Sequence, residues 1–373
     1  MKRILIFIAV SVISIGSFAQ LIKEPYLIYT GNNETMKVMF QAEKPQVYIV
    51  SYGQTKEYEI GSAQISQQKK GKNENIFTYT FKFLKSNSKY YYRISDKHKN
   101  EIYTGYFNSG KQATDKKVYF SVIGNAFLNE WENDSVSKAF VKFKEKKSKF
   151  NSIVLHTGNL VKKGYSEESW NNDFFNKEDF NKRKLHGNIP ILSTLGSNEA
   201  KKSLFSENKL LFRKYFQYPF ASNKDCYYTV KYGNVKFVVL DQFADLDKNS
   251  EQFQWLNKEL KSDSVFRKIV LMHSFGKHKN AASIFSLNSL FEMNKVKLVF
   301  TGNANGYSHI KIGDTHYFST GGKSFAKSKK YREIETIKLL EENSFITVKY
   351  EGDNISIVVF NSNLEIIDKY IIK

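Results

Sequence analysis

Apolar and polar residues alternate along the first third of the chain. Residues 77–83 alternate strictly, residues 36–40 follow the same pattern, and residues 47–52 and 89–94 are rich in Val, Ile and Tyr. A period of two is typical of strands that bury one face, and turn-forming Ser, Asn, Lys and Gly separate these runs. The pattern from about residue 21 to residue 112 therefore predicts a seven-strand β-sandwich.

The pattern changes after residue 117, where continuous apolar runs replace the alternation. Each run has the length of a strand, as expected for strands that are buried on both faces of a sheet. Amphipathic stretches over 135–147, 250–260 and 281–293 predict helices, with Ser250 as the N-cap of the second. The succession of strands and helices predicts a layered α/β domain. The apolar runs cover 118–123, 153–155, 189–195, 235–240, 269–272 and 296–300, and a last strand with a turn and two short strands begins at 345.

The first residues have the organisation of a secretory signal. Lys2 and Arg3 form a basic segment, residues 4–13 are apolar, and Ser17-Phe18-Ala19 offers small residues for cleavage. The apolar segment is shorter than the roughly 20 residues that a membrane-spanning helix needs. No Cys follows it, so a lipid-anchored form is not expected. We therefore expect a signal peptide over 1–19 and export to the bacterial periplasm or cell surface, including association with the outer membrane.

The chain carries a formal net charge of +20, and six of its 57 basic residues are Arg. Recognition of phosphate and nucleic acid favours the bidentate guanidinium group of Arg. An excess made of Lys instead indicates a solvated surface, with attraction to an anionic envelope surface as the second interpretation, and nucleic-acid binding is not expected. The one cysteine, Cys226, excludes an internal disulfide bond and is expected to be a buried, inert thiol.

Five short polar blocks come at the ends of the apolar runs. In open α/β sheets the loops beyond the carboxyl ends of the strands carry the functional groups, so these blocks predict a site. They are Ser-Val-Ile-Gly-Asn at 121–125, His-Thr-Gly-Asn at 156–159, Gly-Ser-Asn-Glu at 196–199, Val-Leu-Met-His at 270–273 and Thr-Gly-Asn-Ala-Asn at 301–305.

The order of these blocks resembles the motifs of calcineurin-like metallophosphoesterases, and of purple acid phosphatases in particular. That family carries a strand-end Asp, Gly-Asp, Gly-Asn-His-Glu, a lone His and Gly-His-x-His in this order. Residues 89–93 and 107–109 resemble parts of the fibronectin-III-like domain that precedes the catalytic domain of purple acid phosphatases. The resemblance implies a fibronectin-III-like β-sandwich over 20–112 and a four-layer αββα metallophosphoesterase-like domain over 117–373.

The resemblance also implies two metal ions, but the ligand residues of the family have been replaced in this chain. Of the seven ligand positions, only the lone His is kept, as His273. Asn198 stands where the family has the His that protonates the leaving group. The other degenerate positions are Asn125 and Asn159 for the two Asp residues, Lys162 for the Tyr, Ser197 for the Asn, and Asn303 and Asn305 for the last two His residues.

These replacements predict a pseudoenzyme without metal, cofactor or catalytic residue. We expect a binding or structural subunit of a cell-envelope complex, with protein partners. Two alternatives remain open at this point. One is a divergent phosphoesterase with a rearranged mononuclear metal site, for which His278, His309 and His316 lie near the blocks. The other is a protein that binds a small polar or anionic ligand in the emptied pocket. His156 is expected to be a strand residue.

Overall fold

The computed structural model describes most of the chain. The described residues are 21–66, 75–124, 131–176, 178–179, 184–201, 210–263, 266–274, 284–302, 306–321 and 334–373. The predicted signal peptide lies outside these residues and stays a prediction.

The first seven strands form two antiparallel sheets around an aromatic core. They are β1 (Leu21–Ile28), β2 (Met36–Ala42), β3 (Tyr48–Gly53), β4 (Gly61–Ile65), β5 (Ile76–Phe81), β6 (Lys89–Asp96) and β7 (Glu101–Asn108). One sheet has the order β1-β2-β5 and the other the order β4-β3-β6-β7. Phe77 packs on Tyr48 with ring centroids 4.7 Å apart, and Phe81 packs on Phe107 at 5.0 Å. These pairs join the two sheets, which confirms the predicted sandwich.

The later strands form two larger sheets. The six-stranded sheet has the order β10 (Ile191–Ser193), β9 (Val154–His156), β8 (Lys117–Ile123), β18 (Ser344–Glu351), β19 (Asn354–Asn361) and β20 (Ile366–Ile372). The seven-stranded sheet has the order β11 (Tyr228–Tyr232), β12 (Val235–Val239), β13 (Arg267–Leu271), β14 (Leu298–Thr301), β16 (Thr315–Ser319), β15 (Tyr307–Ile312) and β17 (Ile334–Leu340). Parallel pairing joins β8, β9 and β10, and also β12, β13, β14 and β16.

The two larger sheets pack face to face through aromatic side chains. The Phe120 ring of β8 lies with its centroid 5.1 Å from that of Phe237 on β12 and 6.0 Å from that of Phe300 on β14. Along β12, Phe237 and Val239 face this inter-sheet core while Val238 faces the helices on the other side. The strands are therefore buried on both faces, as the continuous apolar runs predicted.

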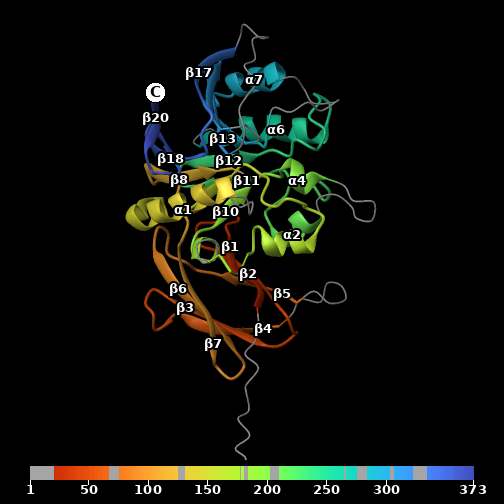
Figure 1. Cartoon of the computed structure of the whole chain (residues 1–373), viewed down its shortest axis with the longest axis vertical. Coiled ribbons are helices and arrows are strands. Elements are labelled where there is room, and N and C mark those ends of the chain that lie inside the picture. The colour runs from red at the N-terminus through yellow and green to blue at the C-terminus, as the bar shows by residue number, and fades with distance from the viewer. Residues whose placement is uncertain are drawn as a thin grey trace, which may run out of the picture.

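Helices cover the outer faces of both sheets (Figure 1). α1 (Trp131–Lys146) lies on the six-stranded sheet, where Phe143 packs on Phe345 of β18 with ring centroids 5.4 Å apart. α6 (Glu251–Lys261) and α7 (Ile284–Met293) pack on the seven-stranded sheet. This arrangement confirms the four-layer αββα fold and the three predicted helices. Shorter helices are η1 (Ser148–Phe150), α2 (Glu167–Asn172), α4 (Ser197–Ala200) and α5 (Leu210–Tyr215). Within the described ranges no helix is long and apolar enough to cross a membrane.

Buried polar groups join the sandwich to the α/β part. The Tyr26 hydroxyl donates to the Tyr215 carbonyl at 3.0 Å, and the Tyr92 hydroxyl donates to the Gly187 carbonyl at 2.7 Å. The Lys23 ammonium group, at 1% exposure, lies 4.6 Å from the centroid of the Tyr215 ring. The strand regions therefore share one continuous core, which includes residues of both parts.

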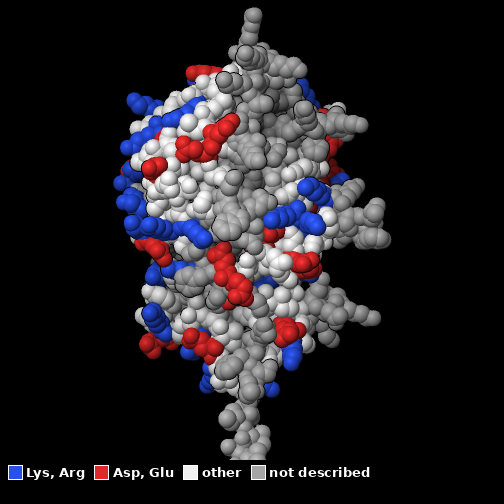
Figure 2. Space-filling view, in the orientation of Figure 1, with Lys and Arg blue, Asp and Glu red and all other residues white. Residues whose placement is uncertain are grey.

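Charged side chains are unevenly spread over the face shown in Figure 2. Lys and Arg gather along the side that carries α1 and β20, with Asp and Glu between them. Lys142, Lys146, Lys147 and Lys149 are exposed on α1 and just after it. Contact of this side with an anionic surface stays a prediction.

Candidate functional site

The polar blocks that end the strands of the two larger sheets meet at one edge. The Thr157 N–H donates to the Ile123 carbonyl at 3.0 Å, which joins the first block to the second. His273 Nδ1 lies 2.6 Å from the Thr157 carbonyl oxygen, and the Gly302 N–H donates to the His273 carbonyl at 2.8 Å. Because parallel strands end at the same edge of a sheet, their loops converge there, as the sequence predicts.

Gly158 allows three of these blocks to approach one another. Its φ is +88°, in the region that glycine adopts readily. A Cβ atom at this position would lie 2.7 Å from Gly196 Cα and 2.8 Å from His273 Nδ1, closer than real Cβ contacts. A larger residue here would therefore push the second, third and fourth blocks apart.

Asn159 links the second block to the third. Its φ is +59°, a left-handed conformation that Asn tolerates better than most residues. The side-chain Oδ1 accepts hydrogen bonds from Ser197 Oγ at 3.1 Å and from the Asn198 backbone N–H at 3.0 Å. The residue is 7% exposed. The amide oxygen at the family's Gly-Asp position therefore holds the neighbouring loop in place.

Glu199 fixes the same two loops through its carboxylate. Oε2 accepts from the backbone N–H groups of Asn159 and Gly196, both at 2.9 Å, and Oε1 accepts from that of Val161 at 3.1 Å. Burial raises the pKa of Glu199 to about 7, against the hydrogen bonds, which lower it. The sequence analysis gave Glu199 no role. Its position three residues after Gly196, the N-cap of α4, is the signal that could have revealed it.

His273 is the retained family residue, and it is fully buried. Burial lowers the pKa of His273 to about 4, although the hydrogen bond to Thr157 acts in the opposite direction. A carbonyl oxygen only accepts hydrogen bonds, so the neutral ring carries its proton on Nδ1 and keeps a lone pair on Nε2. Within the described part of the chain, Nε2 has no hydrogen-bond partner. His273 thus offers one nitrogen to the site.

Lys162 and Asn198 lie toward the solvent side of these loops. Lys162 is exposed, and its backbone N–H donates to Asp173 Oδ2 at 2.8 Å. Asn198 is partly buried, and its Oδ1 accepts from Lys201 Nζ at 3.1 Å. The roles of the residues at the family's Tyr and acid-base His positions stay a prediction.

Several predicted residues are not brought to this edge or are not described. Asn125, His278, Asn303 and Asn305 lie outside the described residues, so their placement stays a prediction. His309 Nε2 and His316 Nδ1 lie 2.9 Å apart on β15 and β16.

The two histidines lie within the strands and not on the strand-end loops. His316 pairs with Leu298 at the first residue of β14, whereas the site lies beyond the last residues of the parallel strands. His309 pairs with Phe318, one residue before the end of β16, and its ring bonds to that of His316. Within the described residues no group of three ligand side chains includes the two rings. A rearranged metal site that also uses His278 therefore stays a prediction. Two other expectations hold: His156 ends β9, and the Cys226 thiol is buried.

Gln242 is a site neighbour that the sequence analysis missed. It follows the predicted strand over 235–240 and is 7% exposed. Its Oε1 accepts the backbone N–H of Ser274, the residue after His273. The Phe243 ring centroid lies 6.3 Å from that of His273. The place of Gln242 just beyond the carboxyl end of a buried strand was the sequence signal that could have revealed its role.

The described donors do not fit the dinuclear metal centre that the resemblance implies. They are one imidazole nitrogen and the neutral oxygens of Asn159, Ser197 and Asn198. The Glu199 carboxylate is committed to three backbone N–H groups. In the described ranges there is no group of three or more His, Cys, Asp or Glu residues that could hold a metal ion. Neutral amides are weak ligands for transition metals beside imidazole and carboxylate.

Sequence comparison supports the family resemblance. The profile described as calcineurin-like phosphoesterase matches residues 94–303, more than half of the chain. Probable purple acid phosphatase 20 of Arabidopsis thaliana is 24% identical over 299 residues, which cover 70% of this chain and 64% of that protein. Purple acid phosphatase 18 of the same plant is 24% identical over 212 residues, 49% of this chain and 46% of that protein. The chain therefore spans less than two thirds of the length of these relatives.

Solved structures show the same fold. The purple acid phosphatase PPD1 from yellow lupin (Lupinus luteus) seeds superposes with a TM-score of 0.77 at 14% identity, covering 94% of this chain and 74% of that one. PhoD superposes with a TM-score of 0.68 at 12% identity, covering 94% of this chain and 88% of that one. Together with the profile match, the fold establishes that this chain belongs to the calcineurin-like phosphoesterase family.

Proposed function

We propose that this chain is a catalytically silent member of its family that acts by binding, as a subunit of a bacterial cell-envelope complex. The observation that carries the proposal is Asn159. At the position where the family uses a carboxylate, the chain has a neutral amide whose oxygen already accepts two hydrogen bonds, from Ser197 and Asn198.

Electrostatics explains why this replacement matters. Two dications about 3.5 Å apart repel each other by roughly 20 kcal/mol at an effective dielectric constant of 20. Anionic ligands must offset that repulsion, and Asn159 supplies no charge. A metal ion would supply the activated water and the clamp on phosphoryl oxygens in this family. The Asn198 amide is far too weak an acid to protonate a leaving group at neutral pH.

Metal content and turnover test the silent site directly. We expect the purified protein to retain no stoichiometric Mn, Fe or Zn after dialysis and to leave p-nitrophenyl phosphate intact. His273→Ala serves as the matched variant, because His273 is the retained family ligand. One equivalent of bound metal, together with turnover that His273→Ala abolishes, would establish the divergent phosphoesterase instead.

Back-substitution provides a second test of the same site. The double variant Asn125→Asp, Asn159→Asp restores both family carboxylates, yet Asn303 and Asn305 still lack imidazole. Because a coordination shell acts as a unit, we expect turnover to stay at background. Hydrolysis of phosphate esters well above background by this double variant would contradict the proposal.

The binding role requires a partner, which cross-linking and pull-down from gently solubilised envelope would reveal. We expect the chain to co-purify with an envelope protein complex through a contact of at least about 1,000 Å². The predicted signal over residues 1–19 and the loss of family ligands support this part of the proposal. A chain that stays monomeric in these extracts, and whose cellular role depends on substitutions at Asn159 or Ser197 alone, would favour a small ligand at the emptied site.

A further inference from the structure

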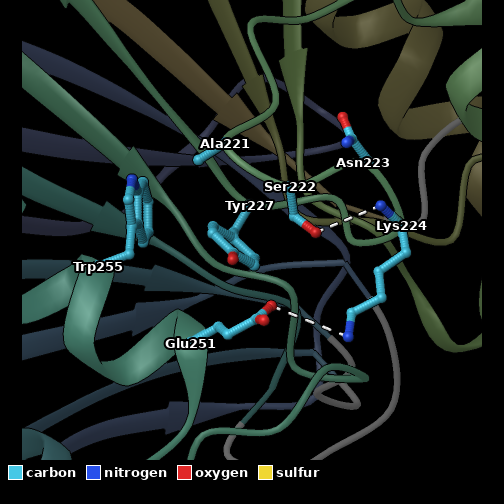
Figure 3. A pocket seen from close by; sticks show the side chains of 7 residues that line it. All are labelled: Ala221, Ser222, Asn223, Lys224, Tyr227, Glu251 and Trp255. Atoms are coloured by element: carbon cyan, nitrogen blue, oxygen red, sulfur yellow. Dashed lines mark hydrogen bonds and ion pairs between the residues drawn. The ribbon is translucent and has the colours of Figure 1, made fainter.

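A pocket beside the start of β11 lies outside the site described above. Its volume is about 550 Å³, and it opens between the loop that precedes β11 and the first turns of α6 (Figure 3). Tyr228 of β11 pairs with Val239 at the end of β12, so the pocket lies at the same edge of the seven-stranded sheet as the polar blocks. We call it the Trp255 pocket. Its lining residues are Ala221, Ser222, Asn223, Lys224, Tyr227, Glu251 and Trp255.

Hydrogen bonds hold the loop wall of the Trp255 pocket in shape. Ser222 Oγ accepts from the backbone N–H groups of Lys224 at 3.3 Å and Asp225 at 3.1 Å. The Ala221 N–H donates to the Tyr227 carbonyl at 3.0 Å, which closes the loop. A wall that is fixed before binding loses little conformational freedom when a ligand enters.

Asp241 fixes both walls of the Trp255 pocket, the loop before β11 and the helix α6. Asp241 Oδ2 accepts the backbone N–H of Cys226 at 2.9 Å, next to the loop. Gln252 of α6 accepts from the Asp241 N–H and donates to the Asp241 carbonyl, both at 2.8 Å. Leu256 and Leu260 bury the inner face of α6. Both walls therefore meet at Asp241, and Trp255 is carried on a helix that cannot easily move away.

The chemistry of the lining combines aromatic surface with balanced charge. The Tyr227 and Trp255 rings lie 4.7 Å apart between centroids, inclined at 48°. Lys224 Nζ and Glu251 Oε2 face each other at 3.8 Å, and their side chains are 75% and 76% exposed. Figure 3 shows this pair across the pocket from the rings. The two charges cancel, so the Trp255 pocket is neutral in a chain whose net charge is +20.

This combination selects a class of ligand. A phosphate ester would bring a negative charge that Glu251 opposes, and the lining has no Arg to grip it. A purely apolar ligand would desolvate the Lys224–Glu251 pair without replacing its hydrogen bonds to water. A neutral saccharide has weakly polar C–H faces for the aromatic rings, and hydroxyl groups at its edge that both donate and accept hydrogen bonds.

We propose that the Trp255 pocket binds a neutral saccharide. One sugar ring lies against Trp255, and its hydroxyl groups donate to Glu251 and accept from Lys224 and Asn223. The pocket shares no lining residue with the degenerate site. The inference therefore stands whether or not that site is silent.

The test is titration of the purified chain with neutral disaccharides, namely maltose, cellobiose and N,N′-diacetylchitobiose. Saturation-transfer NMR and isothermal titration calorimetry report the binding, and glucose 6-phosphate serves as the charged comparison. We expect at least one neutral disaccharide to bind at millimolar concentration and to exceed glucose 6-phosphate in affinity. Trp255→Ala should weaken that binding by about tenfold or more.

Two further variants keep the test decisive. Glu251→Gln removes the charge but keeps the fold and should weaken binding by a smaller factor than Trp255→Ala. Phe83→Ser removes a ring that is 91% exposed on the sandwich and should leave binding unchanged. Absence of binding by all three disaccharides would overturn the proposal. Tighter binding of glucose 6-phosphate, or binding that survives Trp255→Ala in the folded variant, would overturn it as well.

Discussion

Two kinds of buried ionisable residue lie at or near the strand-end loops, and they respond oppositely to pH. Burial raises the pKa of the Glu199 carboxyl to about 7 and lowers the pKa of the His273 imidazole to about 4. Each shift favours the uncharged form in the folded protein, because a charge is poorly solvated there. Both shifts have the same cause, the poor solvation of a buried charge, and both groups lie among the strand-end loops that carry the neutral amides of Asn159 and Asn198.

Glu199→Gln tests this account through the pH dependence of stability. An unfolded Glu has its ordinary pKa of 4.5, whereas burial raises the pKa of folded Glu199 to about 7. The wild type therefore loses stability from this group as the pH rises between those values, and Gln does not titrate. We expect the difference in unfolding free energy, wild type minus variant, to fall by up to about 3 kcal/mol across that range.

Urea denaturation at a series of pH values gives this difference. Glu57→Gln, at an exposed position of the sandwich, is the matched control. A difference that stays constant or rises with pH would show that the three backbone N–H donors outweigh burial at Glu199.

The His309 and His316 pair predicts a pH dependence of the opposite sign. Burial is the largest cause that lowers the pKa of both groups from 6.5 to about 4. Stability that is present above pH 6.5 is therefore lost as the pH falls toward 4. The double variant His309→Gln, His316→Gln should flatten the dependence of the unfolding free energy on pH over this range, and the exposed variant His98→Gln is the control. Parallel curves for wild type and double variant would contradict this account.

Among the elements, strands and helices with a clear hydrophobic pattern, either periodic or continuous, could be predicted from the sequence. The others could not. β8, β12 and β14 are short, apolar and buried on both faces, so their runs stood out. β15, β16 and β17 mix Tyr, His and Lys with apolar residues, since they border polar pairs such as His309 and His316. Their assignment depended on tertiary contacts, and the sequence analysis did not resolve them.

The residues of the candidate site also differ in how far the sequence could reveal them. Positions that follow a strand end, such as Asn159 and His273, could be found from their place after an apolar run and from the family resemblance. Glu199 and Gln242 carried positional signals as well, but their roles could not be derived from them, because those roles lie in hydrogen bonds to backbone groups of distant loops. Spacing reveals which residues share an edge of the sheet, whereas the partners of a side chain depend on how the loops turn.

α6 provides a prediction at the scale of one element. Ser250 Oγ accepts the Phe253 backbone N–H at 3.2 Å and caps the helix that carries Trp255. Ser250→Ala leaves that N–H without its partner and should lower the unfolding free energy by about 1 kcal/mol. Ser289→Ala, within α7, is the control and should cost less, because Ser in a helix interior gives no cap. Equal losses in urea denaturation would show that the cap contributes nothing.

In the whole molecule, most of the aromatic residues act in the core. Of the 23 Tyr and 31 Phe residues, the described ones are largely buried, and Phe83 and Tyr165 are the large exposed aromatics in the described ranges. Tyr26, Tyr29 and Tyr92 donate their hydroxyl protons to carbonyl groups of the α/β part. The abundance of rings therefore gives no support to a partner surface. It explains how two regions without disulfide bonds share one core.

This shared core leads to a prediction about cooperativity. Lys23 of β1 donates to Gln41 Oε1 at 2.5 Å and to Glu167 Oε2 of α2 at 3.4 Å, so its buried charge is paired across the junction. Lys23→Ala leaves Gln41 without this donor and removes one of the cations that Glu167 pairs with. We expect the wild type to unfold in one transition and the variant to lose roughly 2–4 kcal/mol.

Two probes separate the regions, because the three Trp residues all lie beyond residue 130. Trp fluorescence follows the α/β part, and hydrogen exchange of peptides from residues 21–108 follows the sandwich. The two probes should coincide in the wild type and diverge in Lys23→Ala, whereas exposed Lys56→Ala should behave as the wild type does. Separate transitions in the wild type would mean that the sandwich folds independently. In that case the buried hydroxyl and ammonium contacts would position the two regions without coupling their stability.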